Sequence, residues 1–321
     1  MTKILILGGG GMIGQKLARR VLDQDIFPDP QLTIFDRAFP EDGVPSAQVT
    51  GTVSDPAALS ALVAQRPEVI FHLAAIVSGQ AEAEFDLGWE TNMMATWHLL
   101  SALKAEHLAS DGAYRPRLVF TSSIAAFGGP YPETIDDEFL TAPQTSYGAQ
   151  KVVCETMIGD FSRKGYIDGI SLRLPTICIR PGKPNAAASG FFSGIIREPL
   201  NGHEAILPVP DTVRHWPASP RSAARFLTHA ATLDTALLGN RRALNMPGLS
   251  CTIADQIEAL RRVAGQEAVD LIKRVPDPTI MAIVEHWPQT FDPARAIALG
   301  FEAESNFDEI IAAYIEDDLR R

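Results

Sequence analysis

The chain has 321 residues, of which 46% are hydrophobic and 21% are charged, and this composition excludes an intrinsically disordered protein. Its length predicts one large domain with a smaller appended lobe. A formal net charge of −11 argues against a nucleic-acid partner, because binding to a phosphate backbone depends on clustered Lys and Arg.

The chain carries few signals for metals, disulfides or membranes. Cys154, Cys178 and Cys251 are odd in number and far apart, without the spacing of a zinc site or a disulfide framework. We therefore expect no metal and a reducing, cytoplasmic location. The apolar run at residues 4–7 is too short for a signal peptide, and no later run approaches the length of a membrane span, so no membrane partner is expected.

Short apolar runs alternate with segments of helical periodicity through the first half of the chain. The predicted strands are residues 3–7, 32–35, 69–73, 118–121 and 169–174, and the predicted helices are residues 12–22, 56–65, 87–104 and 147–161. Strands that alternate with helices predict an α/β fold, in which a doubly wound parallel sheet of the Rossmann type is covered on both faces.

The pattern changes after Pro175, where residues 180–185 are rich in turn formers. Residues 191–200 and a segment rich in proline through Pro220 follow. Further helices are predicted at residues 222–232, 252–264, 279–285 and 307–317. We expect a dinucleotide-binding domain over residues 1–175, to which residues 216–245 return. Residues 176–215 and 246–321 are expected to form a smaller substrate lobe.

A glycine-rich turn follows the first predicted strand. Gly8, Gly11 and Gly14 fit the pattern Gly-x-x-Gly-x-x-Gly, and a second register, starting one residue later, fits Gly-x-Gly-x-x-Gly. Glycine lets the backbone approach a pyrophosphate, and the helix that begins at Met12 and Ile13 directs its first N–H groups there. A glycine run alone is also typical of a flexible turn, but the strand before it and the helix after it favour a dinucleotide site.

Asp36 closes the second strand about 20 residues beyond the turn, where a ribose-binding carboxylate is expected. Such a carboxylate accepts hydrogen bonds from the adenosine ribose and repels a 2′-phosphate. We therefore predict NAD rather than NADP as the cofactor, although Arg37 beside it weakens this preference. After the strand at residues 69–73, the backbone of Leu73, Ala74 and Ala75 is expected to pass close to the cofactor.

Tyr147 and Lys151 are four residues apart on a predicted helix, so they share one helix face. A tyrosine hydroxyl ordinarily has a pKa of about 10, and a neighbouring cation favours its phenolate form. Ser123 ends a predicted strand at the edge where a parallel sheet presents its ligands. The Tyr-x-x-x-Lys spacing is common by chance, but its place after this strand predicts a proton-transfer site. His72, also at a strand end, is predicted to be structural.

Taken together, these features resemble the short-chain dehydrogenase/reductase superfamily, in particular its extended branch, which includes nucleotide-sugar epimerases and dehydratases. The resemblance covers most of the chain. It is carried by Gly8, Gly11, Gly14, Asp36, residues 72–75, Asn92, Ser122, Ser123, Phe127, Gly128, Tyr147, Lys151 and residues 173–175.

The resemblance implies a role for each of these side chains. Tyr147 is the general acid and base, Lys151 favours its phenolate and contacts the nicotinamide ribose, and Ser123 orients the reacting hydroxyl or carbonyl group. Asn92 is implied to bend its helix near the cofactor, and Pro175 to border the nicotinamide.

Two segments depart from the family pattern. Gly51 is not followed directly by the usual aspartate, which puts adenine contacts there in doubt. Residues 219–221 read Ser-Pro-Arg where sugar-nucleotide enzymes usually carry an element like Val-Asp-Asp, and this weakens an epimerase interpretation.

Residues 173–185, 197–200, 287–288 and 299–301 resemble a sugar-acid dehydrogenase of this branch. That resemblance implies NAD-linked oxidation of the C2 hydroxyl of a four-carbon sugar acid. A carboxylate substrate needs a compensating cation when it is buried. Candidate substrate contacts are Arg180, Lys183, Arg197, Thr176, Ser78 and Ser123, although each of the three cations is also typical of a surface charge or a structural ion pair.

Two other functions stay open at this point. The same residues can oxidise and re-reduce one sugar carbon without net cofactor turnover, which describes a sugar-nucleotide epimerase or dehydratase. A cofactor-sensing regulatory protein would keep the fold without the chemistry, but Ser123, Tyr147 and Lys151 argue against it. The resemblance also implies a homodimer formed through the helices near residues 87–104 and 147–161.

Overall fold

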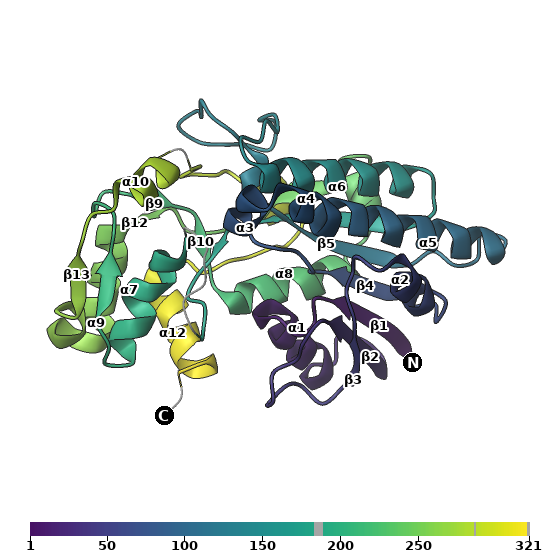
Figure 1. Ribbon diagram of the computed structural model, residues 1–321, viewed down its shortest axis with the longest axis horizontal. Coiled ribbons are helices and arrows are strands. Elements are labelled where there is room, and N and C mark those ends of the chain that lie inside the picture. The colour runs from purple at the N-terminus through teal and green to yellow at the C-terminus, as the bar shows by residue number, and fades with distance from the viewer. Residues whose placement is uncertain (183–188, 286, 320–321) are drawn as a thin grey trace. The chain divides into compact units, whose positions relative to one another are not determined.

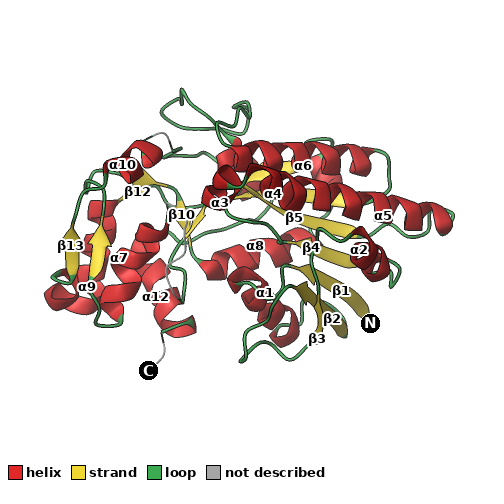
Figure 2. Cartoon of the chain, viewed as in Figure 1, coloured by secondary structure: helices red, strands yellow, loops and turns green. Residues whose placement is uncertain are grey.

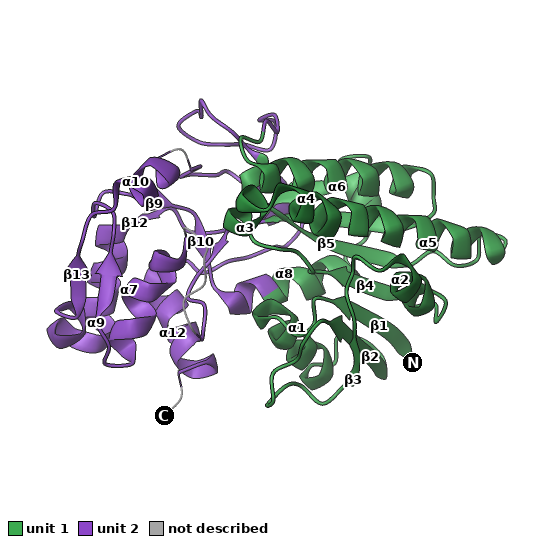
Figure 3. Cartoon of the chain, in the orientation of Figure 1, with its two compact units in different colours: residues 1–126, 143–173, 224–245 green, residues 127–142, 174–223, 246–321 purple. Residues whose placement is uncertain are grey.

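The protein is described from a computed structural model over residues 1–182, 189–285 and 287–319. The chain divides into two compact units, which Figure 3 colours separately. Unit 1 contains residues 1–126, 143–173 and 224–245, and unit 2 contains residues 127–142, 174–223 and 246–321.

A seven-stranded parallel sheet forms the centre of unit 1 (Figure 2). Its strand order is β11-β6-β5-β4-β1-β2-β3. The strands are β1 (Thr2–Leu7), β2 (Pro30–Asp36), β3 (Ala47–Thr50), β4 (Val69–His72), β5 (Arg117–Ser123), β6 (Asp168–Leu174) and β11 (Ala243–Asn245). The chain runs from β1 outward to β3 and then returns through β4 to the other side. This order confirms the predicted doubly wound α/β fold.

Helices cover both faces of the sheet, with α1 and α8 on one side and α2, α5 and α6 on the other (Figure 1). The helices of this unit are α1 (Met12–Asp23), α2 (Pro56–Val63), α3 (Ser78–Ala83), α4 (Phe85–Gly88), the π-helix η1 (Trp89–Met94), α5 (Ala95–Ala109), the 3₁₀ turn η2 (Ile124–Ala126), α6 (Ser146–Arg163), α8 (Pro220–Thr232) and the 3₁₀ turn η3 (Thr235–Leu238). Leu5 and Leu7 of β1 pack into the core under α5, whereas Ile4 and Ile6 are buried on the opposite face. Burial on both faces explains the unbroken apolar run in β1.

The helix predicted over residues 87–104 is three pieces in the structure. α4 ends at Gly88, a single π-helical turn follows as η1, and α5 continues to Ala109. The Asn92 side chain bonds both backbone groups of Ile76, accepting from its N–H at 2.8 Å and donating to its carbonyl at 3.2 Å. The π turn therefore forms where this helix is tied to the segment after β4.

The unit boundaries differ from the expected domain limits in three places. Leu174 and Pro175 belong to unit 2, although the expected first domain reaches residue 175. Residues 127–142 belong to unit 2 because Ile135 forms a β-bridge with Phe291 and the Phe127 ring packs on the Phe291 ring. Residues 216–223 also belong to unit 2, where the Ser219 amide donates to the Glu304 carboxylate. These last two segments are fixed by partners far away in the sequence.

Unit 2 is built from helices and three two-stranded sheets. Its elements are β7 (Thr176–Ile177), α7 (Gly190–Leu200), β8 (Ala205–Leu207), β9 (Arg214–His215), β10 (Pro217–Ala218), β12 (Cys251–Thr252), α9 (Ile253–Val269), β13 (Ile272–Arg274), α10 (Pro278–Val284), α11 (Ala294–Ala298) and α12 (Phe307–Asp317). α7, α9 and α12 enclose a core that includes Phe192, Leu260 and Ile311. Over the described ranges, no helix has both the length and the apolarity needed to cross a bilayer.

Candidate active site

The glycine turn places backbone where side chains are excluded. Gly8 has a φ of +87°, and a Cβ there would lie 2.6 Å from the backbone nitrogen of Ala74. A Cβ on Gly14 would lie 2.4 Å from the Gly8 carbonyl oxygen, so α1 begins directly against the turn. The first N–H groups of α1, at Met12 and Ile13, have no partner within the helix. The result is a turn with free amides at a helix N-terminus, which fits a pyrophosphate.

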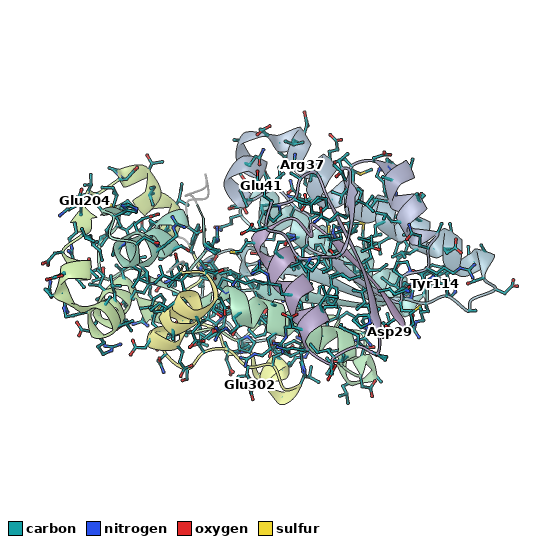
Figure 4. The ribbon with its side chains drawn as sticks, turned by 90° about the horizontal axis from the view of Figure 1, so that it is seen from below. Asp29, Arg37, Glu41, Tyr114, Glu204 and Glu302 are labelled. Carbon is teal, nitrogen blue, oxygen red and sulfur yellow. The ribbon has the colours of Figure 1, made fainter. Side chains whose placement is uncertain are left out.

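The Asp36 carboxylate is held at the edge of this turn. One oxygen accepts from the Gly10 N–H at 2.9 Å and the other from the Arg37 N–H at 2.7 Å. Arg37 and Glu41 lie exposed on the loop that follows β2, as Figure 4 shows from below. Gly10 lies outside the family pattern, yet a Cβ there would lie 2.0 Å from the Ala38 carbonyl oxygen. Its signal in the sequence is only that the glycine run is uninterrupted.

The segment after β4 is fixed against β1. The amides of Leu73 and Ala74 both donate to the Leu7 carbonyl, at 2.8 and 3.0 Å. Ala75 is exposed and Ser78 opens α3 with partial exposure. Asn92 is buried, and its amide also donates to Gln150 at 2.7 Å. The side chain of Asn92 therefore holds the segment at Ile76 in place, and its predicted place near the cofactor stays a prediction.

Tyr147 and Lys151 are brought together in α6. Tyr147 lies in the first turn, which is capped by the Thr145 side chain accepting from the Gly148 N–H at 3.1 Å. The Lys151 ammonium is almost fully buried, lies 5.4 Å from the centre of the Tyr147 ring, and donates to the Thr121 carbonyl on β5 at 2.7 Å. The two side chains that the sequence predicts as a proton-transfer pair therefore lie close together.

Ser123 lies at the carboxyl end of β5, next to the start of α6. Its hydroxyl oxygen accepts from the Ala125 N–H at 3.1 Å. A Cβ on Gly148 would lie 2.1 Å from the Ala125 carbonyl oxygen, so the turn after Ser123 touches the helix turn that carries Tyr147. The structure therefore places the three predicted catalytic residues along one contact, between β5 and α6.

His72 is buried at the end of β4, and one ring nitrogen bonds the Thr96 hydroxyl at 2.9 Å. Burial, with a smaller contribution from the Lys151 charge, lowers the pKa of His72 from 6.5 to about 3. A ring that stays neutral at physiological pH is structural here, as the sequence predicts.

The remaining predicted site residues belong to unit 2. Thr176 is partly exposed in β7, next to the buried Pro175. The Arg180 side chain donates to the Ile177 carbonyl at 2.9 Å and stays partly exposed. Arg197 is only 4% exposed.

The guanidinium of Arg197 pairs with Glu198 and donates to the Arg180 carbonyl at 2.8 Å. Its charge is thus compensated by Glu198 in a buried site, and its predicted contact with the substrate stays a prediction. Lys183 lies outside the described residues.

Sequence reasoning also missed a buried network behind Ser123. The Ser122 hydroxyl donates to Glu155, and Arg173 forms an ion pair with the same carboxylate at 2.7 Å. Its signal was present, because Glu155 follows Lys151 by four residues and so shares the face of α6. Over the described ranges, no group of three or more His, Cys, Asp or Glu side chains is placed to hold a metal.

The parallel sheet, the glycine turn and Asp36 define an NAD-binding oxidoreductase of the Rossmann class. Residues 4–239 match the family described as the NAD dependent epimerase/dehydratase family. The chain belongs to that family, and the predicted resemblance and the NAD cofactor are confirmed.

Three relatives match nearly the whole chain. A D-erythronate dehydrogenase of Cupriavidus necator is 45% identical, with 98% of each chain covered. A D-erythronate dehydrogenase of Haemophilus influenzae is 41% identical, with 99% of this chain and 100% of the relative covered. A crystal structure described as a nucleoside-diphosphate-sugar epimerase from Agrobacterium tumefaciens is 54% identical, with a TM-score of 0.94 over 98% of this chain and 94% of that one.

Proposed function

We propose that this protein is an NAD-dependent dehydrogenase that oxidises the C2 hydroxyl of D-erythronate to give 2-oxo-tetronate. The observation that carries the proposal is the full-length similarity to two D-erythronate dehydrogenases, at 41% and 45% identity. The same short sugar acid is implied by the sequence resemblance. The partly exposed Tyr147 beside the buried Lys151 supports it, because alcohol oxidation needs a base for the hydroxyl proton.

Ser123 hydrogen-bonds the C2 hydroxyl and orients it, and Tyr147, as phenolate, accepts the hydroxyl proton. Lys151 keeps its charge beside the tyrosine and stabilises the phenolate. NAD, when bound, would supply the acceptor for the hydride from C2. The amides at the glycine turn hold the pyrophosphate, with Leu73 to Ala75 beside it, and the Asp36 carboxylate accepts from the adenosine ribose.

We assign the substrate carboxylate to Arg180, which keeps part of its surface exposed. Thr176 and Ser78 are the proposed polar contacts to the other hydroxyl groups, and Pro175 borders the nicotinamide. A carboxylate needs a charged partner once water is excluded, and a guanidinium can bind it through two parallel hydrogen bonds. Arg197 supports this arrangement indirectly, because its hydrogen bond fixes the Arg180 backbone.

Net NADH formation tests the proposal. We expect the purified protein to produce NADH from D-erythronate and NAD, and much less with NADP because Asp36 repels a 2′-phosphate. Five- and six-carbon aldonates serve as matched controls for substrate length. Absence of NADH with D-erythronate, under conditions where NAD binds, would contradict the assignment.

A sugar-nucleotide epimerase is the second candidate, because the 54% identical crystal structure is described as one. Epimerisation returns the hydride to the same sugar carbon, so no NADH accumulates. Incubation with UDP-sugars, followed by separation of the epimers, distinguishes the two functions. The Ser-Pro-Arg sequence at residues 219–221 favours the dehydrogenase.

We also propose that two copies pair through the face formed by η1, α5 and α6, in the cytoplasm. Three large apolar side chains share one side of the continuous helix formed by η1 and α5. They are Met94, Trp97 and Leu108, which are 37%, 44% and 57% exposed. Such a row of large apolar side chains is typical of an interface.

Trp97→Glu is expected to convert a dimer to a monomer, because it places a charge in that apolar row. Light scattering coupled to gel filtration measures the mass. Leu237→Glu, at an exposed position on η3, is the control and should leave the mass unchanged. A wild-type monomer, or a Trp97→Glu variant that stays dimeric, would remove this interface.

A further inference from the structure

Behind Ser123, a buried ion pair links four elements of unit 1, namely α6, β5, β6 and β11. Arg173 of β6 donates from Nε and Nη2 to the Glu155 carboxylate of α6, at 3.0 to 3.1 Å and 2.7 Å. Its Nη1 donates to Asn245 of β11 at 3.3 Å. The Ser122 hydroxyl of β5 donates to the same carboxylate. Strands β5, β6 and β11 are thereby fixed to the helix that carries Tyr147.

The pair is buried close to the reacting groups. The side chains of Glu155 and Arg173 are only 6% and 14% exposed. Ser122 precedes Ser123 directly, so holding Ser122 also fixes the backbone of the proposed substrate-orienting residue. Glu155 follows Lys151 by one helical turn, about 6 Å along the axis, and Tyr147 by two turns, about 12 Å.

We propose that Glu155 and Arg173 are positioning residues for the dehydrogenase reaction proposed above, on which this inference rests. The Glu155 carboxylate bonds Ser122 and so fixes α6 against the end of β5. The Arg173 guanidinium neutralises the negative charge of Glu155 beside Lys151. While the two charges are paired they largely cancel, so the pair adds little net charge beside Lys151 and Tyr147.

The other titratable groups near this site in unit 1 do not take over that role. On β4, His72 is neutral because burial lowers its pKa to about 3. On α6 itself, burial raises the pKa of the Cys154 thiol, so it stays protonated. Asn245 and Ser122 carry no charge. Glu82 of α3 accepts from the Ser146 N–H at 2.9 Å, next to Tyr147, but it is exposed, so water and salt screen its charge, and it is the same in every variant below. Glu155 and Arg173 are the buried ion pair beside Lys151.

The inference predicts shifts of opposite sign from the two halves of the pair. Arg173→Gln leaves the Glu155 carboxylate uncompensated, which disfavours a phenolate and moves its titration to higher pH. Glu155→Gln leaves the Arg173 cation uncompensated and moves the titration to lower pH. Coulomb's law at about 12 Å with an effective dielectric near 20 gives shifts of about half to one pH unit. The double variant should return towards the wild-type midpoint.

Two measurements report the pH midpoint of the Tyr147 titration. One is the ultraviolet absorbance of the phenolate in the NAD-bound protein, with Tyr147→Phe as the blank, and it needs no substrate. The other is the pH dependence of kcat/KM with D-erythronate. Arg173→Lys keeps the positive charge but loses the planar guanidinium that bonds both carboxylate oxygens. It should therefore keep the midpoint of the Tyr147 titration and lower kcat. A wild type without turnover would overturn the proposed function, while the absorbance titration would still decide this inference.

Arg117 and Asp168 form the matched control at the amino ends of the same two strands. They are paired at 2.8 Å, with side chains 16% and 21% exposed. Arg117→Gln and Asp168→Asn should leave the midpoint unchanged. NAD binding and thermal unfolding identify any variant that fails to fold. Single variants of Glu155 and Arg173 that shift the midpoint in the same direction, or by no more than these controls, would overturn the inference.

Discussion

Tyr147→Phe is expected to lower kcat for D-erythronate oxidation by a factor of about 10² to 10⁴, the usual contribution of a positioned acid or base. The variant loses only the hydroxyl oxygen. The ring, its place over the capped first turn of α6 and its distance of 5.4 Å from the Lys151 ammonium can all be retained. Steady-state NADH formation measures the loss.

Cofactor binding should survive this substitution. The glycine turn and Asp36 do not depend on the Tyr147 hydroxyl, so the NAD dissociation constant is expected to change by less than tenfold. Tyr166→Phe removes the same atom from a tyrosine whose ring packs on Phe161 and His107, and it should retain full activity. Equal turnover by Tyr147→Phe and the wild type would remove the proton-transfer role. If the wild type and Tyr147→Phe both bind NAD but neither has activity, the result would instead favour a cofactor-sensing protein.

The sequence predicts the nucleotide-binding half of the fold because its signals are local. The strand at Thr2–Leu7, the glycine turn and the helix at Met12–Asp23 are consecutive, and each has a pattern of its own. β3 was missed because all four residues of Ala47–Thr50 are exposed, so no apolar alternation marks it. An edge strand of this kind is defined by its pairing with β2.

In the site, too, local patterns are predictable from the sequence and contacts between distant segments are not. Tyr147, Lys151 and Ser123 are found from spacing and from their place at strand and helix ends. The ion pair between Glu155 and Arg173 joins positions 18 residues apart, and only the register of α6 against β6 brings them together. Arg197 is buried and paired with Glu198, and its sequence context does not distinguish it from an exposed cation in the same lobe.

Acid should destabilise this protein in the range where two buried histidines must take up protons. Burial and, to a smaller extent, the Lys151 charge lower the pKa of His72 from 6.5 to about 3. Burial alone lowers the pKa of His215 from 6.5 to about 3. A group with a depressed folded-state pKa stabilises the folded form above its unfolded value. That stability is therefore present above pH 6.5 and is lost as the pH falls towards 3.

The expected loss is large on the scale of a folded domain. At pH 4.5, two units below the ordinary value, each neutral histidine costs about 3 kcal/mol relative to the unfolded chain, against a typical total of about 5–15 kcal/mol. His72 lies in unit 1 and His215 in unit 2, where its ring stacks on Phe192 at 3.7 Å. Amide hydrogen exchange between pH 7.5 and 4.5, corrected for the intrinsic rate, measures each unit separately.

Single substitutions separate the two contributions. His72→Leu should flatten the pH dependence of unit 1, and His215→Leu that of unit 2, whatever each does to stability at neutral pH. His203→Asn, at an exposed position, serves as the control and should keep the wild-type slope, because its ring remains in water when the protein folds. Unchanged slopes in both Leu variants would mean that carboxylates alone govern the acid transition. A slope lost in one unit only would assign the proton uptake to that histidine.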